Sequence, residues 1–399
     1  MIEKTLAELT LNITDGKHGD CRGKDDSGFY FISCKDVRDG QIYYEDARQI
    51  IEEDFWDTHK RTRLEPEDIL VTNSGTIGRM AFIRDVPLTY RTTFQKSVAI
   101  VKPDKSKIFP KYLYYQLQNC VDGFVNQSNG AAQKNLLLST MRAFKMNIHE
   151  DEDTQIRIAS KLSVYDDLIE NNQKQIKLLE EAAQRLYKEW FVDLHFPGHE
   201  TTPITDGIPE GWKKYKFSEI ASIMSGGTPK TEVKEYYDGD IPFYTPKDSD
   251  GAFFAFDTIT HISQSGLDHC NSQYYPVGTV IITARGTVGK TTILAVPMAM
   301  NQSCYALKCD ELNSPYYLFF SLNKEVSALK TMANGGVFNT IIVKTFDSIH
   351  LTVPTRDVLA AFDAAASSIM EQIKAKMQQN THLVAARDRL LPKLMNGEI

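Results

Sequence analysis

The hydrophobic and polar positions of the chain follow two patterns, and each pattern occurs twice. Residues 1–150 and 213–355 contain short β-branched and aromatic runs broken by Gly, Pro, Asn and Asp, which predict strands and turns. Residues 151–192 and 356–399 carry apolar residues at helical spacing and predict two long helices. The chain is therefore expected to form two mixed domains, each followed by a long helix, with a linker over 193–212.

The first long helix has a heptad pattern. Leu162 and Tyr165 begin two series that repeat every seven residues over four heptads, as in a coiled coil. The second helix is less regular, because Asn380 and Arg387 interrupt its apolar series. Asn172 and Asn380 are expected to fix the register of the pair. The predicted seam consists of Leu162, Tyr165, Ile169, Asn172, Ile176, Leu179, Ala183, Leu186 and Trp190 on the first helix, and of Ile369, Ile373, Met377, Val384, Leu391 and Leu394 on the second.

Neither long helix is expected to be stable by itself, because helices owe most of their stability to the packing of an apolar face. We therefore expect the two helices to pack against each other as an antiparallel pair. Since one helix follows each domain, this pairing would place the domains at opposite ends. A helix over residues 156–191 would extend roughly 50 Å at a rise of 1.5 Å per residue.

An internal repeat supports this twofold organisation. Residues 72–78 (TNSGTIG) align with residues 283–289 (TARGTVG) at an offset of 211. The offset falls to 207 where Phe94-Gln95 aligns with Asn301-Gln302, and it reaches 204 within the long helices. A falling offset is what a duplicated unit with small loop deletions produces, and the order of features is kept throughout.

Length and composition agree with two folded domains. The 399 residues are 42% hydrophobic and 24% charged, which excludes disorder as the dominant state. The net charge is −7, yet residues 1–150 are balanced and residues 151–200 hold 11 acidic against 6 basic residues. Most of the excess acid therefore lies on one short stretch, and the total charge neither supports nor excludes a nucleic-acid partner.

Cysteine spacing and hydropathy indicate the compartment. The six cysteines form no C-x-x-C pair, which indicates reduced thiols and argues against a disulfide framework or a zinc site. The first residues have mixed charge and no apolar signal core, and no apolar run is long enough to cross a bilayer. We therefore expect a cytoplasmic protein with no membrane anchor.

Three motifs that suggest chemistry have simpler explanations. Residues 285–291 resemble a phosphate-binding loop, but Ala284 stands where that motif requires glycine, so a strand-ending turn is favoured. The chain has no Asn/Asp-Pro-Pro-Tyr/Phe motif, so no resident amino-methyltransferase is expected. His195 and His199 are separated by Pro-Gly, which prevents a helix from aligning them on a metal.

The chain resembles the specificity subunit of type I restriction-modification enzymes. The resemblance is carried by residues 186–198 (LYKEWFVDLHFPG), 208–212 (IPEGW) and 389–399 (RLLPKLMNGEI). Residues 225–230 (SGGTPK) look like the turn that opens a target-recognition domain in that family. The Pro-Pro-x-x-x-Gln segment usual before the long helices of the family is reduced to Gln155 in the first copy.

The resemblance implies an α+β fold in which two pseudo-repeated mixed α/β target-recognition domains are joined by an antiparallel two-helix coiled coil. Each domain would read one half of a split sequence in double-stranded DNA, and the helices would dock two methyltransferase subunits. The assembled enzyme would methylate adenine or, with its restriction (motor) subunits, cleave unmethylated DNA. S-adenosylmethionine, ATP and Mg²⁺ would be bound by the other subunits, so no catalytic residue, cofactor or metal is expected in this chain.

Sequence-specific contact requires hydrogen-bonding groups for base edges and cations for phosphates, and loops on a rigid scaffold can present both. In the first domain the candidates are Lys17, His18, Lys35, Arg38, Arg79, Gln95, Lys96, Asn129, Gln133 and Lys134. In the second they are Thr228, Lys230, Lys247, Arg285, Lys290, Gln302, Asn334 and Asn339. The alternative for each is an exposed polar residue without a partner. The two sets differ at most positions, so the half-sites should differ.

A second function of another class remains open at this point. The long helices could recruit protein partners while the two end domains bind peptides, which would make the chain a protein-interaction scaffold. Selective binding to a split DNA sequence would distinguish the two hypotheses.

Overall fold

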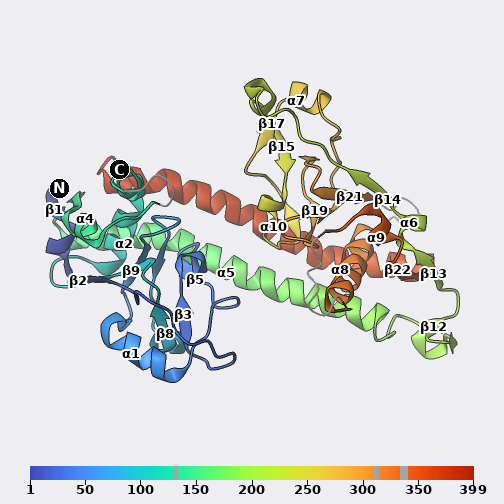
Figure 1. Cartoon of the computed structure of the whole chain (residues 1–399), viewed down its shortest axis with the longest axis horizontal. Coiled ribbons are helices and arrows are strands. Elements are labelled where there is room, and N and C mark those ends of the chain that lie inside the picture. The colour runs from blue at the N-terminus through green and yellow to red at the C-terminus, as the bar shows by residue number, and fades with distance from the viewer. Residues whose placement is uncertain (129–133, 309–311, 313, 333–339) are drawn as a thin grey trace. The chain divides into compact units, whose positions relative to one another are not determined.

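The chain folds into two compact units, whose elements are labelled in Figure 1. The computed structural model describes residues 1–128, 134–308, 312, 314–332 and 340–399. Unit 1 comprises Met1–Glu170 together with Thr381–Ile399, and unit 2 comprises Asn171–Asn380. The boundaries fall inside the two long helices, α5 (Glu152–Phe191) and α10 (Arg356–Met395), so each unit contains a part of both.

Unit 1 is built around a four-stranded antiparallel sheet in the order β2-β9-β6-β7. Beside it, β3 pairs with β8 in parallel, and β1 pairs with β10 in antiparallel fashion. The strands are β1 (Ile2–Thr5), β2 (Thr10–Asp15), β3 (Tyr30–Ile32), β4 (Val37–Arg38), β5 (Gln41–Ile42), β6 (Ile69–Thr72), β7 (Met80–Phe82), β8 (Thr92–Phe94), β9 (Val98–Pro103) and β10 (Lys145–Ile148). The shorter helices are α1 (Glu52–Thr62), α2 (Pro110–Asn119), α3 (Val121–Asn126) and α4 (Leu138–Ala143).

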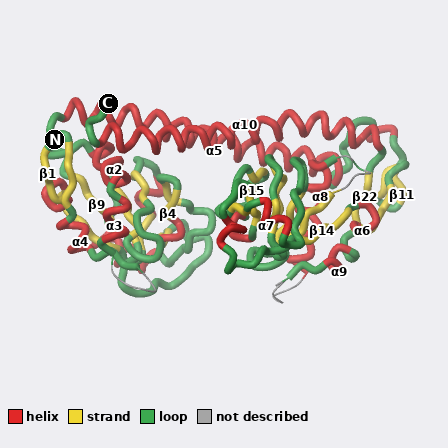
Figure 2. The backbone as a smooth tube through the Cα atoms, turned by 90° about the horizontal axis from the view of Figure 1, so that it is seen from above, coloured by secondary structure: helices red, strands yellow, loops and turns green. Residues whose placement is uncertain are grey.

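The sheet of unit 1 is buried on both faces. Ile69 and Val71 of β6 point into a core that contains Tyr112 and Leu113 of α2. Leu70, between them, points into a second core on the opposite face. This alternation explains why β6 is apolar along its whole length, as strands covered on both sides are. Figure 2 shows β9 of this sheet next to α2.

Unit 2 repeats this plan around a five-stranded sheet in the order β14-β21-β18-β19-β16. Its strands are β11 (Ile204–Thr205), β12 (Ile208–Pro209), β13 (Lys213–Lys216), β14 (Ser222–Ser225), β15 (Ile241–Tyr244), β16 (Phe254–Ala255), β17 (His261–Ile262), β18 (Val280–Thr283), β19 (Thr291–Leu294), β20 (Ala299–Met300), β21 (Cys304–Lys308) and β22 (His350–Val353). Its shorter helices are α6 (Phe217–Ile220), α7 (Gln264–Asp268), α8 (Pro315–Met332) and α9 (Val343–Phe346).

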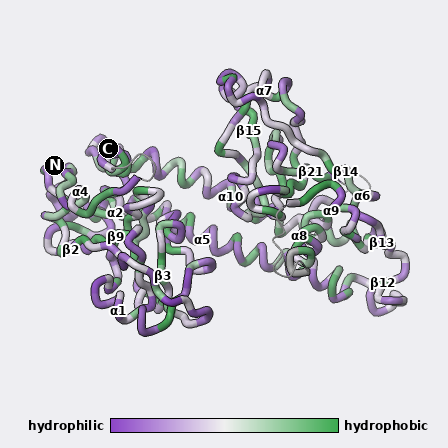
Figure 3. Tube along the Cα trace, viewed as in Figure 1, coloured by the Kyte–Doolittle hydropathy of each residue, from purple (hydrophilic) through white to green (hydrophobic). Residues whose placement is uncertain are grey.

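The pairing of the strands confirms the internal repeat. The order β14-β21-β18-β19 reproduces β2-β9-β6-β7, and the parallel pair β15 and β20 reproduces β3 and β8. The antiparallel pair β13 and β22 likewise reproduces β1 and β10. In Figure 3 hydrophobic residues colour the region of β14 and β21, whereas α1 at the surface of unit 1 is hydrophilic. The predicted α+β fold with two pseudo-repeated mixed units is therefore confirmed.

Within unit 1, the first half of α5 packs antiparallel on the last part of α10. Leu162 of α5 shares a buried core with Leu391 and Leu394 of α10. One turn further along α5, Asp166 accepts a hydrogen bond from Arg387 at 2.8 Å and another from the Tyr115 hydroxyl at 2.6 Å. The arginine that interrupts the apolar series thus has a carboxylate partner on the facing helix.

Within unit 2, the second half of α5 packs antiparallel on the first part of α10. Asn172 donates hydrogen bonds to Asn380 Oδ1 at 2.9 Å and to Gln379 Oε1 at 3.0 Å. Towards the end of α5, the Trp190 ring lies 5.8 Å from the ring of Phe362. The two asparagines predicted to fix the register therefore pair with each other.

All fifteen predicted seam residues are buried or half-buried. The sequence interpretation nevertheless missed the first part of the α10 seam, where Phe362, Ala366 and Met370 are fully buried. This stretch is rich in alanine, whose small side chain gives a weak apolar signal. The predicted placement of the two domains at opposite ends of the pair remains a prediction.

Both ends of α5 are fixed by specific contacts. At its start, Gln155 accepts a hydrogen bond from the Phe109 N–H at 2.8 Å and donates to the His149 carbonyl at 2.7 Å. After its end, Phe196 is buried against Trp212, with 4.8 Å between the ring centroids. The predicted linker is therefore packed into unit 2. Across the described part of the chain, the helices lack the combination of length and apolarity that a membrane span requires.

Candidate nucleic-acid interface

The β6–β7 hairpin of unit 1 ends in a tight turn organised by a buried threonine. The Thr72 N–H donates to the Arg79 carbonyl at 2.8 Å, and Thr72 Oγ1 accepts from the Arg79 N–H at 2.9 Å. The same hydroxyl donates to the Thr76 carbonyl. Gly75 and Gly78 have φ angles of 79° and 87°, which non-glycine residues rarely adopt. This turn presents the exposed side chain of Arg79.

The β18–β19 hairpin of unit 2 contains the same turn. The Thr283 N–H donates to the Lys290 carbonyl at 2.9 Å, and Thr283 Oγ1 accepts from the Lys290 N–H at 3.0 Å. The hydroxyl again donates to a carbonyl four residues on, that of Thr287. Gly286 and Gly289 again have positive φ angles. Residues around 285–291 therefore form a strand-ending turn, as predicted.

A second loop follows β3 in unit 1. Ser33 Oγ donates to Asp36 Oδ2 at 2.7 Å, and the Asp36 N–H donates to the Ser33 carbonyl at 3.1 Å. The Cys34 N–H donates to Ser97 Oγ at 3.1 Å and ties this loop to the connection between β8 and β9. Lys35 is exposed at the tip of the loop.

The loop after β15 in unit 2 is closed in the same way. Thr245 Oγ1 donates to Asp248 Oδ2 at 2.8 Å, and the Asp248 N–H donates to the Thr245 carbonyl at 3.0 Å. Thr287 Oγ1, in the hairpin turn, donates to the Pro246 carbonyl at 3.2 Å. The two loops are therefore joined, and Lys247 is exposed at the tip.

A third loop, after β2, packs directly on the end of β8. The Lys17 N–H donates to the Phe94 carbonyl at 2.8 Å, and the Lys96 N–H donates to the Lys17 carbonyl at 3.1 Å. A Cβ atom on Gly16 would lie only 2.1 Å from the Phe94 carbonyl oxygen, so the approach requires glycine. Gly226 has the same relation to the Met300 carbonyl in unit 2, at 2.3 Å.

Further main-chain bonds join the hairpin turn of each unit to two more segments, the connection before β9 or β21 and the segment at Leu136 or Ile341. In unit 1 the Asn73 N–H donates to the Ser97 carbonyl at 3.1 Å, and the Asn73 carbonyl accepts from the Leu136 N–H at 2.8 Å. In unit 2 the Ala284 N–H donates to the Ser303 carbonyl at 2.7 Å, and the Ala284 carbonyl accepts from Ile341 at 2.9 Å. We call the three loops of each unit, together with these two segments, the loop cluster.

These bonds correct the alignment of the two copies by one residue. The Gln95 N–H donates to the carbonyl at the end of β3 at 2.8 Å, and the Asn301 N–H donates to the carbonyl at the end of β15 at 3.0 Å. Gln95 therefore corresponds to Asn301, and Lys96 corresponds to Gln302, at an offset of 206. The sequence alignment at 207 was wrong here because both copies carry an amide residue next to the correct position.

Comparison with known protein families identifies the family to which the chain belongs. The family described as "Type I restriction modification DNA specificity domain" matches residues 22–181 and 209–379, which is most of the chain. The chain belongs to this family. The two matched segments lie in its two specificity domains, and each contains most of one loop cluster, the loop at residues 16–18 lying just before the first segment.

Two curated relatives match along most of their own length. The HindI specificity subunit of Haemophilus influenzae is 24% identical over 75% of this chain and 80% of the relative. The MjaIX specificity subunit of Methanocaldococcus jannaschii is 25% identical over 83% of this chain and 77% of the relative. A crystal structure of a type I restriction-modification S subunit from M. genitalium has the same fold, with a TM-score of 0.54 at 15% identity, over 99% of this chain and 96% of that one.

The loop cluster of the first specificity domain brings together most of the residues predicted there. These are Lys17, His18, Lys35, Arg79, Gln95, Lys96 and Lys134. The Lys17 ammonium, however, lies 3.5 Å from Asp57 Oδ2 of α1. Arg38 lies on the separate β4–β5 hairpin, with its guanidinium 4.0 Å from the centre of the Tyr43 ring. Asn129 and Gln133 lie outside the described residues.

In the second specificity domain, the loop cluster contains Thr228, Lys247, Arg285, Lys290 and Gln302, all of them exposed. The Thr228 hydroxyl donates a hydrogen bond to Gln302 Oε1, which joins the loop after β14 to the connection between β20 and β21. Lys230 is exposed two residues further along. Asn334 and Asn339 lie outside the described residues. Contact between any of these residues and DNA stays a prediction.

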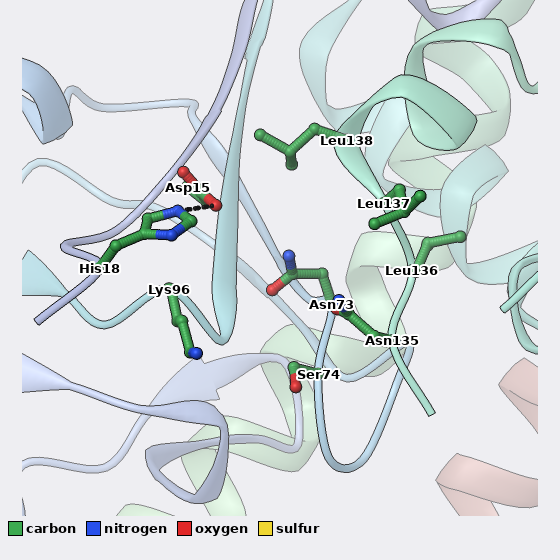
Figure 4. A pocket seen from close by; sticks show the side chains of 9 residues that line it. All are labelled: Asp15, His18, Asn73, Ser74, Lys96, Asn135, Leu136, Leu137 and Leu138. Carbon is green, nitrogen blue, oxygen red and sulfur yellow. Dashed lines mark hydrogen bonds and ion pairs between the residues drawn. The ribbon is translucent and has the colours of Figure 1, made fainter. Parts of the chain in front are cut away.

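A pocket of about 410 Å³ opens in the loop cluster of the first domain (Figure 4). His18 and Lys96 lie on one side of it, and Asn135 with Leu136 to Leu138 lies on the other. His18 Nε2 is 2.8 Å from Asp15 Oδ2, and this buried carboxylate is also paired with Arg61. The pocket thus combines a cation, an imidazole and an apolar wall.

Sequence reasoning missed four polar residues that line this pocket: Asp15, Asn73, Ser74 and Asn135. Each lies within a few residues of a predicted candidate, in the same turn-rich segments. Asn73 and Ser74 stand within the TNSGTIG repeat, which was the available signal for them, and Asn135 stands next to the candidate Lys134.

The two histidines of the linker have protein partners. His195 Nδ1 lies 3.0 Å from a Glu189 carboxylate oxygen, and His199 Nδ1 lies 2.8 Å from the Phe196 carbonyl. Among the residues that the structure describes, no three His, Cys, Asp or Glu side chains form a group that could hold a metal ion.

Proposed function

We propose that the chain is the sequence-recognition subunit of a type I restriction-modification system and that its two specificity domains each read one half of a split DNA sequence. The observation that supports this most is the repeated loop cluster. Two sets of the same main-chain bonds present different exposed polar side chains. Two readers on one chain produce a bipartite site, as the two subunits of a dimeric DNA-binding protein do.

The charges of the loop clusters suit this role. Lys35 and Arg79 in the first domain, and Lys247, Arg285 and Lys290 in the second, are exposed cations on adjoining loops. Such side chains neutralise phosphates, and they supply most of the affinity of DNA-binding proteins. The whole chain nevertheless has a net charge of −7. We therefore expect the isolated chain to bind DNA weakly and to bind tightly once its partners add positive contacts.

The partners in this proposal are two methyltransferase subunits and, for cleavage, the restriction subunits. Family membership supports an assembly of this kind, and α5 offers a surface for it. Val164 and Leu168 lie one turn apart on α5 and are 56% and 43% exposed, although both are apolar. They lie in the stretch 151–200, which holds 11 acidic against 6 basic residues. A basic partner with an apolar contact would fit this face.

In this assembly the chain contributes recognition, and the chemistry belongs to the other subunits. Adenine methylation would use S-adenosylmethionine, and DNA cleavage would use ATP and Mg²⁺. All three would be bound outside this chain. The loop clusters would hold the duplex in register while the partner subunits act on it.

Selection from a random DNA library tests the proposal. The chain is purified with the methyltransferase subunits of its own system and incubated with 40-base-pair duplexes of random sequence at moderate salt. Filter-bound duplexes are then sequenced. We expect enrichment of two short defined elements separated by a gap of constant length and free sequence.

Two comparisons complete the test. The same selection with the isolated chain should give much weaker retention of DNA. Duplexes that keep one element and randomise the other should bind more weakly than those with both. Equal retention of selected and random DNA by the full complex would show that the chain is no sequence reader, and peptide binding by its domains would then be the hypothesis to examine.

A further inference from the structure

The hydrogen bonds of the loop clusters assign a counterpart in unit 2 to each loop residue of unit 1. Lys35 corresponds to Lys247, because each stands just before the aspartate that closes its loop. Arg79 corresponds to Lys290, because each is the residue whose N–H and carbonyl bond the buried threonine of the hairpin turn. At both positions the charge is the same in the two units.

These four cations are also available for binding. Each is exposed, and within the ranges that the structure describes none of the four takes part in an ion pair. The phosphate backbone is chemically the same in every DNA sequence. A position that contacts phosphate can therefore remain cationic in two domains that read different half-sites.

Another pair of positions differs between the units. His18 corresponds to Thr228. In each unit, the N–H of the residue before it donates to the last carbonyl of a strand, which is β8 in unit 1 and β20 in unit 2. Lys96 corresponds to Gln302 in the corrected alignment. Thr228 and Gln302 are hydrogen-bonded to each other, and His18 and Lys96 lie on the same side of one pocket (Figure 4). The two positions are therefore neighbours in both units, with different side chains.

The chemistry of these side chains predicts different bases. A lysine ammonium can only donate hydrogen bonds, and in the major groove it suits the O6 and N7 acceptors of guanine. A glutamine amide donates and accepts, and it suits the N6 and N7 groups of adenine. A change from lysine to glutamine at one position of the same scaffold is thus a change of preferred base.

A third position, in the pocket of unit 1, also carries a different side chain from its counterpart in unit 2. Asn73 lines it and is 4% exposed, and its Oδ1 has no hydrogen-bond partner in the described structure. Buried polar atoms are usually paired, so an unpaired amide oxygen here is consistent with a hydrogen-bond donor supplied by a ligand. The counterpart in unit 2 is Ala284, which has no polar side-chain atom.

We propose that the two domains share one set of phosphate-binding cations and differ at a pair of base-reading residues. Lys35 and Arg79 hold phosphates for unit 1, and Lys247 and Lys290 hold them for unit 2. The reading pairs are His18 with Lys96 and Thr228 with Gln302. Lys96 selects guanine and Gln302 selects adenine. This assignment rests on the proposed DNA-reading function.

The phosphate assignment is tested by salt dependence in the complete complex with its methyltransferase subunits. Binding of the selected duplex is measured from 50 to 300 mM salt for K35A and for K290A. Each variant should lower the slope of log affinity against log salt by about 0.9 and leave the selected sequence unchanged. K105A is the matched control, because the exposed Lys105 lies at the opposite end of β9 from Lys96 and should change neither quantity.

The reading assignment is tested by repeating the library selection with K96Q and Q302K. K96Q should replace guanine by adenine at one position of the first element only, and Q302K should do the reverse in the second. Affinity for the original duplex should fall on the order of 10- to 100-fold. Lys96 and Gln302 are exposed, as are Lys35 and Lys290 of the salt test. The thermal unfolding of each of the four variants should therefore match that of the unmodified chain.

The outcomes separate this inference from the function on which it rests. If the unmodified complex selects no sequence, the proposed function fails and this assignment fails with it. If that complex selects a split sequence but K96Q and Q302K leave it unchanged, only the reading assignment is overturned. If K35A or K290A changes the selected bases, the phosphate assignment is overturned.

Discussion

The buried threonine of each hairpin turn offers a matched pair of substitutions, Thr72→Val and Thr283→Val. Valine has the shape of threonine but cannot accept the Arg79 N–H or donate to the Thr76 carbonyl in unit 1. A buried group left without its partner costs about 1 to 3 kcal/mol. Thr76 is exposed, so water can satisfy its carbonyl, and the unpaired N–H carries most of the loss. We expect the T72V variant to destabilise the β6–β7 hairpin by roughly 2 kcal/mol.

Hydrogen–deuterium exchange measured by mass spectrometry can resolve this loss to individual peptides. T72V should accelerate exchange in peptides of β6 and β7 by roughly 30-fold, which is the factor that 2 kcal/mol represents. T283V should do the same for β18 and β19. Each variant should leave the hairpin of the other unit unchanged, because each hydroxyl bonds only within its own turn.

The control is Thr76→Val, which changes an exposed side chain and keeps the carbonyl that Thr72 uses. Its exchange pattern should match that of the unmodified chain. If T72V and T76V prove indistinguishable, or if the loss is below about 0.5 kcal/mol, the threonine does not organise the turn and our argument from its hydrogen bonds is wrong.

Three further predictions concern the helix pairs. Replacing Arg387 by methionine leaves the largely buried Asp166 without its charged partner. The unfolding free energy measured in urea titrations should fall by about 2 to 3 kcal/mol. The same replacement in a chain that already carries D166N should cause a smaller loss. Burial, with the nearby Asp250 carboxylate, raises the pKa of Glu180 to about 7, so the contribution of Glu180 to stability falls as pH rises from about 4.5 to 7. The unfolding free energy of E180Q should therefore equal that of the unmodified chain near pH 4.5. At pH 8 it should be higher by on the order of 1 kcal/mol, a modest value because the side chain is only half-buried. Asn172→Leu leaves the Asn380 and Gln379 side chains without the donor they share, so the melting temperature should fall by a few degrees. An unchanged or higher melting temperature would show that this polar contact fixes the register of the helices without adding stability.

The sequence was sufficient to predict the architecture because two signals reinforced each other. The heptad series from Leu162 to Trp190 predicted the length of α5 to within a few residues, and the repeated TNSGTIG and TARGTVG segments predicted equivalent hairpins. The seam of α10 was predicted only in part. Packing of Phe362, Ala366 and Met370 depends on what faces them, and periodicity alone does not report that for an alanine-rich segment.

The site could be predicted only as a set of loops. The cations Lys35, Arg79, Lys247 and Lys290 were among the candidates because lysine and arginine in turns are conspicuous, and the structure places all four in the loop clusters. The relation between Lys96 and Gln302 was not accessible, since it depends on main-chain bonds that align the copies at 206 and not at 207. The ion pair of Lys17 with Asp57 was also hidden, because it joins residues that are distant in the sequence.

The composition of unit 1 has a consequence for how the protein is made. Thr381–Ile399 belong to this unit, and Leu391, Leu394 and Met395 fill its core although they are synthesised more than two hundred codons after Glu170. The apolar surface of the first domain that these residues cover therefore stays exposed on the nascent chain while more than two hundred further codons are translated. Chaperone binding during that interval, and proteolysis of products that stop before residue 381, would both act on this one uncovered surface.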